Sequence, residues 1–129
     1  MKSKTILVCL LLTVLSFGVF AGADPAMAQL NPTRVYVISV DGTIELGLSQ
    51  YVLRGFKQAA QDRAAVLIEI NTFGGRADAA VEIRDYILRM DTPVIAFVRE
   101  RAISAGALIA ISAPHIAMAR GSTIGAAEP

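Results

Sequence analysis

The sequence contains no tryptophan, only one cysteine and only one histidine. The cysteine, Cys9, lies in an uncharged N-terminal stretch, so the rest of the chain can form no disulfide and offers no thiol for catalysis. A lone histidine, His115, without a cysteine cluster argues against a metal centre. The chain also lacks an excess of charge of either sign, because residues 29–129 hold equal numbers of basic and acidic side chains. Such a balance does not favour a polyanion. We expect no metal, no cofactor and no nucleic-acid partner.

The uncharged N-terminal stretch has the features of a secretory signal peptide. Lys2 and Lys4 precede a run without charge from Thr5 to Ala23, and Ala26-Met27-Ala28 places small residues where signal peptidase cuts. We expect residues 1–28 to be removed and the rest to be exported. The alternative is an uncleaved membrane anchor, because the uncharged run is about long enough to span a bilayer.

The remaining segment, residues 29–129, alternates strand-like and helix-like patterns. Apolar β-branched runs indicate strands, and apolar residues at three- and four-residue spacing indicate helices. We expect strands over 34–40, 65–70, 94–98 and 115–119, and helices over 48–61, 77–90 and 104–112. This alternation predicts an α/β fold with a parallel sheet between helix layers. Because a four-strand sheet of this kind leaves an exposed edge, we interpret the chain as truncated on its C-terminal side.

A double glycine, Gly74-Gly75, stands between the second strand and the second helix, within N-T-F-G-G-R-A-D-A-A from Asn71 to Ala80. Glycine lets the backbone pass close to a ligand. Unpaired N–H groups at a helix start can hold a carbonyl oxygen as it becomes an oxyanion. Taken alone, the dipeptide is more typical of a tight turn. The pattern G-x-G-x-x-G is absent, so no dinucleotide site is predicted.

Ser104 stands at the next strand-to-helix junction, within I-S-A-G from Ile103 to Gly106. Its small neighbours leave room for a substrate, and a helix N-terminus stabilises negative charge near the hydroxyl. Taken alone, the motif is more typical of an N-cap serine. A nucleophilic serine also needs a base. His115 is more typical of a hydrogen-bonded structural residue, and Lys57, the only lysine after the signal segment, falls on the polar side of a helix. The residues supply a candidate nucleophile without a base.

Four segments together resemble a known family. N-T-F-G-G-R-A-D-A-A, P-V-I-A-F-V, A-I-S-A-G-A-L-I-A-I-S-A-P-H-I-A-M-A and G-S-T-I-G-A-A-E-P are similar to the NfeD membrane-bound serine proteases of the ClpP/crotonase superfamily, from about Val35 to Pro129. The resemblance implies a ClpP/crotonase-like parallel sheet with flanking helices. It also implies that residues 29–129 are the N-terminal part of a ClpP-like serine protease domain.

The resemblance assigns roles to the two motifs. It implies that Ser104 is the nucleophile and that the backbone N–H groups of Gly75, supported by Gly74, and of Ala105 are the oxyanion donors. The partner base in the family is a lysine downstream of the S-T-I-G-A element, which would lie beyond this chain.

The ClpP relatives instead use a histidine just before a Gln-Pro pair. The matching stretch here is Ala127-Glu128-Pro129, so alanine occupies that place. This departure argues against a ClpP-type triad and against His115 as the base. We therefore expect a Ser-Lys dyad completed from outside the chain, and little or no turnover from the chain alone.

The resemblance implies a serine endopeptidase that cleaves membrane-associated peptide or protein substrates, with stomatin-like membrane proteins as candidates. It implies further C-terminal membrane spans and a protease domain on the extracytoplasmic side. We also expect a homo-oligomer. Two alternatives stay open. One is a crotonase-like acyl-CoA enzyme, which shares the fold and an oxyanion hole made of two N–H groups. Such an enzyme would need acid or base residues in its pocket and would not need a serine at position 104. A non-catalytic scaffold would bind stomatin-like partners without cleaving them.

Overall fold

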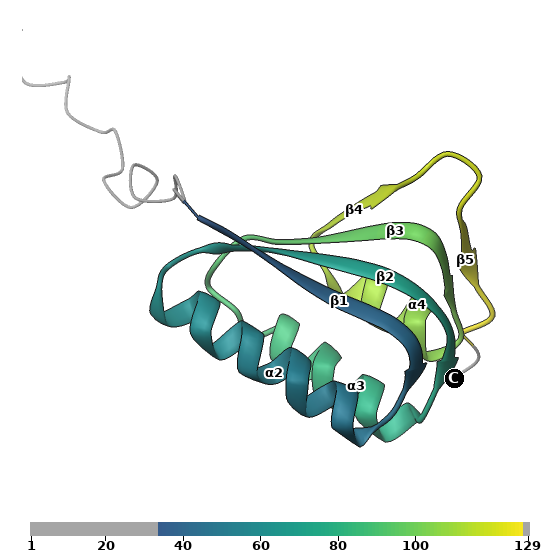
Figure 1. Ribbon diagram of the computed structural model, residues 1–129, viewed down its shortest axis with the longest axis horizontal. Helices are drawn as coiled ribbons and strands as arrows, with labels where there is room; N and C mark the ends of the chain where they lie inside the picture. Colours follow the sequence, from purple (N-terminus) through teal and green to yellow (C-terminus); the bar gives the residue numbers. More distant parts are fainter. Residues whose placement is uncertain (1–33, 128–129) are drawn as a thin grey trace, which may run out of the picture. The chain divides into compact units, whose positions relative to one another are not determined.

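Strands and helices alternate along the chain, as the sequence predicts. The computed structural model describes residues 34–127, so the expected signal segment, residues 1–28, lies outside the described residues. None of the helices in the described stretch is long and apolar enough to cross a membrane. The elements (Figure 1) are β1 (Val35–Ile44), α2 (Leu46–Gln61), β2 (Ala65–Gly75), α3 (Ala77–Ile87), β3 (Val94–Ile103), α4 (Ala105–Ser112), β4 (His115–Met118) and β5 (Thr123–Gly125).

All strand pairs are parallel, in the order β1-β2-β3-β4, and β5 lies beside the end of β3. Because the strand order follows the chain order, right-handed crossovers place the helices between them on the same face of the sheet. Figure 1 shows α2, α3 and α4 on one side of the sheet. The predicted parallel sheet is confirmed. The expectation of helices on both faces is wrong for the described residues, which carry helices on one face.

The core lies between the sheet and these helices. Alternate strand residues reach it: Ile38 pairs with Ile68, Ile68 pairs with Ala96, and all three side chains are buried. Phe56 of α2 and Ile83 of α3 are fully buried against them. Burying one such large side chain stabilises the fold by about 1.5–3 kcal/mol. Truncating Phe56 to alanine would cost about 3–5 kcal/mol because a cavity would remain.

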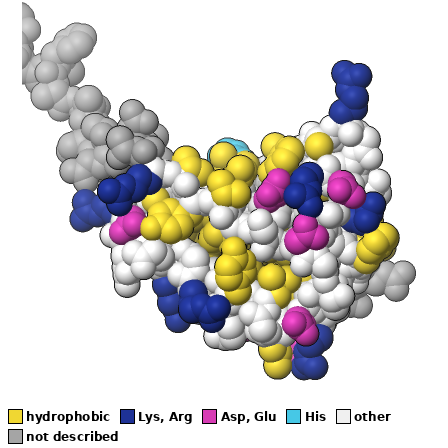
Figure 2. All heavy atoms as spheres, in the orientation of Figure 1, with side chains coloured by type: hydrophobic (Ala, Val, Ile, Leu, Met, Phe, Trp, Pro, Cys, Tyr) yellow, Lys and Arg dark blue, Asp and Glu magenta, His cyan; other side chains and the backbone are white. Residues whose placement is uncertain are grey.

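The opposite face of the sheet is more polar and is covered by no helix within residues 34–127. Val35 and Val37 are 59% and 58% exposed on this face. Arg99 contacts Asp41 at 2.6 Å and Glu69 at 3.8 Å. Figure 2 shows exposed hydrophobic side chains next to a group of mixed acidic and basic side chains.

Three strands run further than the sequence predicts. β1 continues past Val40 to Ile44 through an irregularity at Gly42, where φ is +78°. β2 continues past Ile70 because the end of β1 supplies its backbone partners, and β3 continues past Val98 because β5 does the same. β5 has only three residues and is missing from the prediction. The helix ends differ from the expected ones by at most three residues.

Candidate active site

Two strand-to-helix junctions, β2 to α3 and β3 to α4, meet at the carboxyl edge of the sheet. Gly74 at the first junction lies directly against Ser104 at the second. A Cβ placed on Gly74 would lie 2.9 Å from the Ser104 Cβ and 3.3 Å from the Ser104 Oγ. The φ of Gly74 is +111°, which disfavours any side chain. The glycine therefore keeps the space beside the serine hydroxyl open.

Ser104 has a backbone conformation that is unusual for serine. Its φ is +53° and its ψ is −119°, and its N–H donates to the carbonyl of Gly125 at 2.9 Å. The residue is exposed, and within residues 34–127 its hydroxyl makes no capping hydrogen bond to α4. The N-cap role that the motif alone suggested is therefore not the one seen here. Strain of this kind, about 1–3 kcal/mol, persists where the surroundings fix the backbone, and it is frequent at active sites.

The start of α4 presents free backbone donors beside Ser104. The Ser104 carbonyl accepts hydrogen bonds from the N–H groups of Ala107 at 2.9 Å and Leu108 at 3.2 Å. The N–H groups of Ala105 and Gly106, the two residues before them, have no partner inside the helix. No acidic residue lies in the first turn of α4. The positive end of the helix dipole is therefore left uncompensated next to the hydroxyl.

Gly75 brings a further donor to the same edge. The N–H of Arg76 donates to the Ile44 carbonyl of β1 at 2.8 Å. Because successive residues of an extended strand direct their N–H groups to opposite sides, the Gly75 N–H points away from β1, towards the side of β3 and Ser104. A Cβ on Gly75 would lie 2.7 Å from the Ile44 nitrogen, so no other residue fits this close approach.

Thr72 is a site residue that the sequence analysis missed. It is 2% exposed, and its hydroxyl accepts the N–H of Gly74 at 2.9 Å and donates to the carbonyl of Gly42. The other helix-facing residues of β2 before it, Val66, Ile68 and Ile70, are all apolar. A polar residue at such a buried strand position is the signal that could have revealed it.

Neither base considered from the sequence lies near Ser104. His115 pairs with Ile95 at the start of β3, whereas Ser104 follows the end of β3. The His115 side chain is exposed at this opposite edge of the sheet. Lys57 is also exposed, in the second half of α2. The geometry therefore agrees with the argument against His115 and gives Lys57 no contact with the two junctions.

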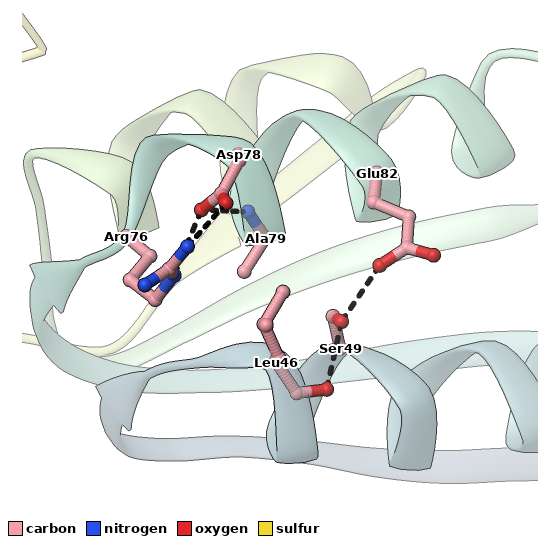
Figure 3. A network of polar contacts seen from close by, with 6 residues as sticks. All are labelled: Leu46, Ser49, Arg76, Asp78, Ala79 and Glu82. Carbon is pink, nitrogen blue, oxygen red and sulfur yellow. Dashed lines mark hydrogen bonds and ion pairs between the residues drawn. The ribbon is translucent and has the colours of Figure 1, made fainter.

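Arg76 and Asp78 stabilise the start of α3, as their positions suggest. The Arg76 guanidinium donates to both carboxylate oxygens of Asp78, at 3.0 and 2.6 Å, and the Ala79 N–H donates to the same carboxylate at 2.9 Å. The hydrogen bond from Arg76 holds the pKa of Asp78 below its ordinary value. Figure 3 shows this pair beside a second link, in which buried Ser49 of α2 donates to Glu82 of α3 at 2.8 Å.

A pocket of about 220 Å³ opens near the bend of the sheet but does not include the serine. It is lined by residues 41–43 of β1, residues 71–73 of β2 and Arg101 of β3. The Arg101 guanidinium lies 4.4 Å from the centre of the Phe73 ring.

Within residues 34–127, no group of three or more His, Cys, Asp or Glu side chains is arranged to hold a metal ion.

The fold places the chain in a class of α/β proteins that includes ClpP. A ClpP1 mutant from Listeria monocytogenes superposes with a TM-score of 0.59 at 24% identity, over 60% of this chain and 46% of that one, and it supports the fold alone. Residues 34–129 match the NfeD1b N-terminal domain, and the chain belongs to this family. The resemblance drawn from the sequence motifs is therefore confirmed.

Two curated relatives come from different organisms. The chain is 41% identical over 101 residues to the membrane protein NfeD1b of Bacillus subtilis (strain 168), covering 78% of this chain and 23% of the relative. It is 41% identical over 111 residues to the membrane-bound protease PH1510 of Pyrococcus horikoshii, covering 83% and 24%. The chain thus spans about a quarter of the length of the curated relatives that it matches.

Two solved structures of the 1510-N membrane-bound stomatin-specific protease are also similar. A serine-to-alanine mutant superposes with a TM-score of 0.72 at 39% identity, over 78% of this chain and 50% of that one. A lysine-to-alanine mutant in complex with a substrate peptide superposes with a TM-score of 0.71 at 40% identity, over 78% of this chain and 48% of that one.

Proposed function

We propose that this chain is the N-terminal part of an NfeD-type serine endopeptidase domain, with Ser104 as the nucleophile. The observation that carries the proposal is the uncapped, exposed hydroxyl of Ser104 on a strained backbone, between Gly74 and the open start of α4. The names of the relatives support it. PH1510 is called a protease, and the 1510-N structures carry mutations of a serine and of a lysine.

The proposed chemistry is acyl transfer in two steps. The Ser104 Oγ attacks the scissile carbonyl carbon, its proton passes to a neutral lysine, and the carbonyl electrons move onto the oxygen as an oxyanion. The N–H groups of Gly75 and Ala105 hold that oxyanion. When it collapses, the C–N bond breaks and the leaving amine takes the proton from the lysine; water then hydrolyses the acyl-enzyme. Removing one oxyanion donor typically lowers kcat by about 10²–10³.

The base and the cellular setting belong to the proposal as well. We place the lysine of a Ser-Lys dyad beyond residue 129, because His115 and Lys57 lie away from Ser104. Residues 1–28 would act as the signal segment, which places the protease domain outside the cytoplasm. Membrane association follows the names of both curated relatives. A peptide substrate, with stomatin-like proteins as the candidate source, follows the names of the 1510-N proteins. A homo-oligomer is also proposed.

The test uses the complete protein and a fluorophosphonate probe, with cleavage of a hydrophobic peptide as the second readout. Wild-type protein should be labelled at Ser104, and Ser104→Ala should lose both labelling and cleavage. Ser39→Ala is the matched control, because Ser39 is an exposed serine on β1; it should behave as wild type. Wild-type protein that neither reacts with the probe nor cleaves peptide would refute the protease.

The same variants separate the alternatives. A scaffold would bind stomatin-like partners equally well with Ser104 or alanine and would cleave nothing. A crotonase-like enzyme would turn over an acyl-CoA without labelling at Ser104. Purified residues 29–129 should show little or no turnover; cleavage at the rate of the complete protein would contradict a base located downstream.

A further inference from the structure

We infer that Thr72 is a positioning residue for the proposed oxyanion hole, because it fixes the double glycine relative to the start of α4. This inference rests on the proposed function, since it assigns no chemistry to Thr72 itself. Thr72 lies on β2 just before the double glycine and faces the helices. Its hydroxyl and its methyl group contact different parts of the site, and both contacts are buried.

The hydroxyl holds the double glycine. It has one proton, which it donates to the carbonyl of Gly42, and its lone pair accepts the N–H of Gly74 at 2.9 Å. The Gly74 N–H is therefore already used and is not available to a substrate. This leaves the N–H of Gly75 as the donor from this segment and gives Gly74 a supporting role.

The methyl group contacts the other half of the site. A Cβ placed on Gly106 would collide with the Thr72 Cγ2, so the methyl lies directly against the first turn of α4. Gly106 follows Ala105, the second proposed donor. One buried side chain therefore contacts both segments that carry the oxyanion donors, and it sets their spacing.

That spacing matters for the reaction. Both donors must lie about 2.7–3.1 Å from the position that the oxyanion occupies in the transition state. A misplacement of about 1 Å can lower the rate about 100-fold. The ground-state carbonyl uses these donors less, so their misplacement should lower kcat with little change in KM.

The test measures kcat and KM of the complete protein with a fluorogenic peptide whose sequence is taken from the hydrophobic tail of a stomatin-like protein. Thr72→Val keeps the shape and removes the hydroxyl; we expect kcat to fall about 10- to 100-fold with KM changed less than about threefold. Thr72→Ser keeps the hydroxyl but loses the methyl contact with α4, so its kcat should lie between those of Thr72→Val and wild type.

Thr92→Val is the matched control. Thr92 is half-buried just before β3, at the opposite edge of the sheet, and its hydroxyl oxygen has no partner within residues 34–127. It should keep the wild-type kcat. If Thr72→Val cannot fold, Thr72→Ser and Thr72→Ala provide a pair that differs only in the hydroxyl, and the alanine variant should be the slower one.

The outcomes separate the inference from the proposed function. Ser104-dependent cleavage with wild-type kcat in Thr72→Val, or equal kcat in the serine and alanine variants, would overturn the inference and leave the protease standing. A loss in Thr92→Val equal to that in Thr72→Val would overturn it too. Wild-type protein without Ser104-dependent cleavage would instead refute the protease. Deuterium exchange at the Gly74 amide, expected to be faster in Thr72→Val and unchanged in Thr92→Val, tests the hydrogen bond in either case.

Discussion

The starts of α3 and α4 lie at the same edge of the sheet, yet their electrostatics differ. At α3, the carboxylate of Asp78 accepts the Ala79 N–H and pairs with Arg76, so the helix compensates its own dipole. At α4, no side chain within the described residues caps the helix and no acid lies in the first turn. The difference indicates which start is open to an external negative charge. It is the one that carries Ser104.

The residues that make the two turns also differ. Gly74 adopts a φ of +111° and Ser104 a φ of +53°. Glycine adopts positive φ without steric cost, whereas the conformation of Ser104 costs a serine about 1–3 kcal/mol. Glycine therefore lets the β2–α3 turn form without strain. The β3–α4 turn is strained at Ser104 and is held in place by its neighbours, including the hydrogen bond from the Ser104 N–H to the Gly125 carbonyl.

Among the residues at and beside the two turns, the largest expected effect on stability concerns Gly75 in the β2–α3 turn. In Gly75→Ala, the Cβ would lie 2.7 and 2.8 Å from the nitrogen and carbonyl carbon of Ile44, which cannot move aside within β1. We expect the free energy of unfolding to fall by about 3 kcal/mol, measured by urea denaturation. Gly47→Ala in α2, where the nearest atom is 3.6 Å away, should instead raise it by about 0.5–1 kcal/mol. A fully stable Gly75→Ala would contradict the close approach.

Gly106 gives the corresponding test at α4. Its substitution by alanine forces a methyl group against the Thr72 Cγ2, which should cost about 1–3 kcal/mol of unfolding free energy. Thr72→Ser removes this Cγ2 methyl group, so the double variant should recover part of the lost stability in a double-mutant cycle. Simple additivity of the two changes would show that the Thr72 methyl does not limit the approach of α4.

A smaller effect is expected where α3 is attached to α2. The Ser49 hydroxyl is fully buried and lies 2.8 Å from Glu82 and 3.0 Å from the Leu46 carbonyl. Ser49→Ala should lower the free energy of unfolding by about 1–2 kcal/mol, because the buried hydroxyl donates to a charged, half-buried carboxylate and this hydrogen bond is lost. Exposed Ser39→Ala should change it by less than about 0.5 kcal/mol. Equal effects of the two would mean that the link between the helices adds no stability.

Helix positions and strand centres could be predicted from the sequence because they depend on local pattern. α2 and α3 have clear apolar periodicity, and β2 and β3 have buried apolar centres. Strand ends could not be predicted in the same way. Asp41-Gly42 has the sequence of a turn, but pairing between Thr43 and Gly74 carries the strand through it. That pairing is non-local, so no local pattern indicates it.

The candidate site was predictable in its parts. Ser104 and the double glycine stand out in the sequence, and the structure brings them into contact. Their contact depends on sheet order and register, which the sequence alone does not specify. The role of Thr72 escaped notice because threonine is common in strands, and its burial depends on how far β2 extends.

The smallest expected effect tests the closed start of α3. Arg76 and Asp78 are 56% and 58% exposed, so solvent screens their interaction. The pKa of Asp78 is lowered in the folded protein, chiefly by the hydrogen bond from Arg76. A lowered pKa stabilises the fold above the unfolded-state pKa of about 4 and loses this effect as pH falls through the folded-state pKa. Asp78→Asn should therefore have a slightly lower urea midpoint than wild type at pH 7, and the two midpoints should converge as pH falls below about 4.

The control for this pH series is Asp91→Asn. Asp91 is exposed and belongs to none of the ion pairs found among residues 34–127. Its urea midpoint should follow wild type at pH 7. A difference between Asp78→Asn and wild type that persisted unchanged into strong acid would show that the carboxylate charge is not what stabilises the start of α3. The contrast with α4 would then rest on hydrogen-bond geometry alone.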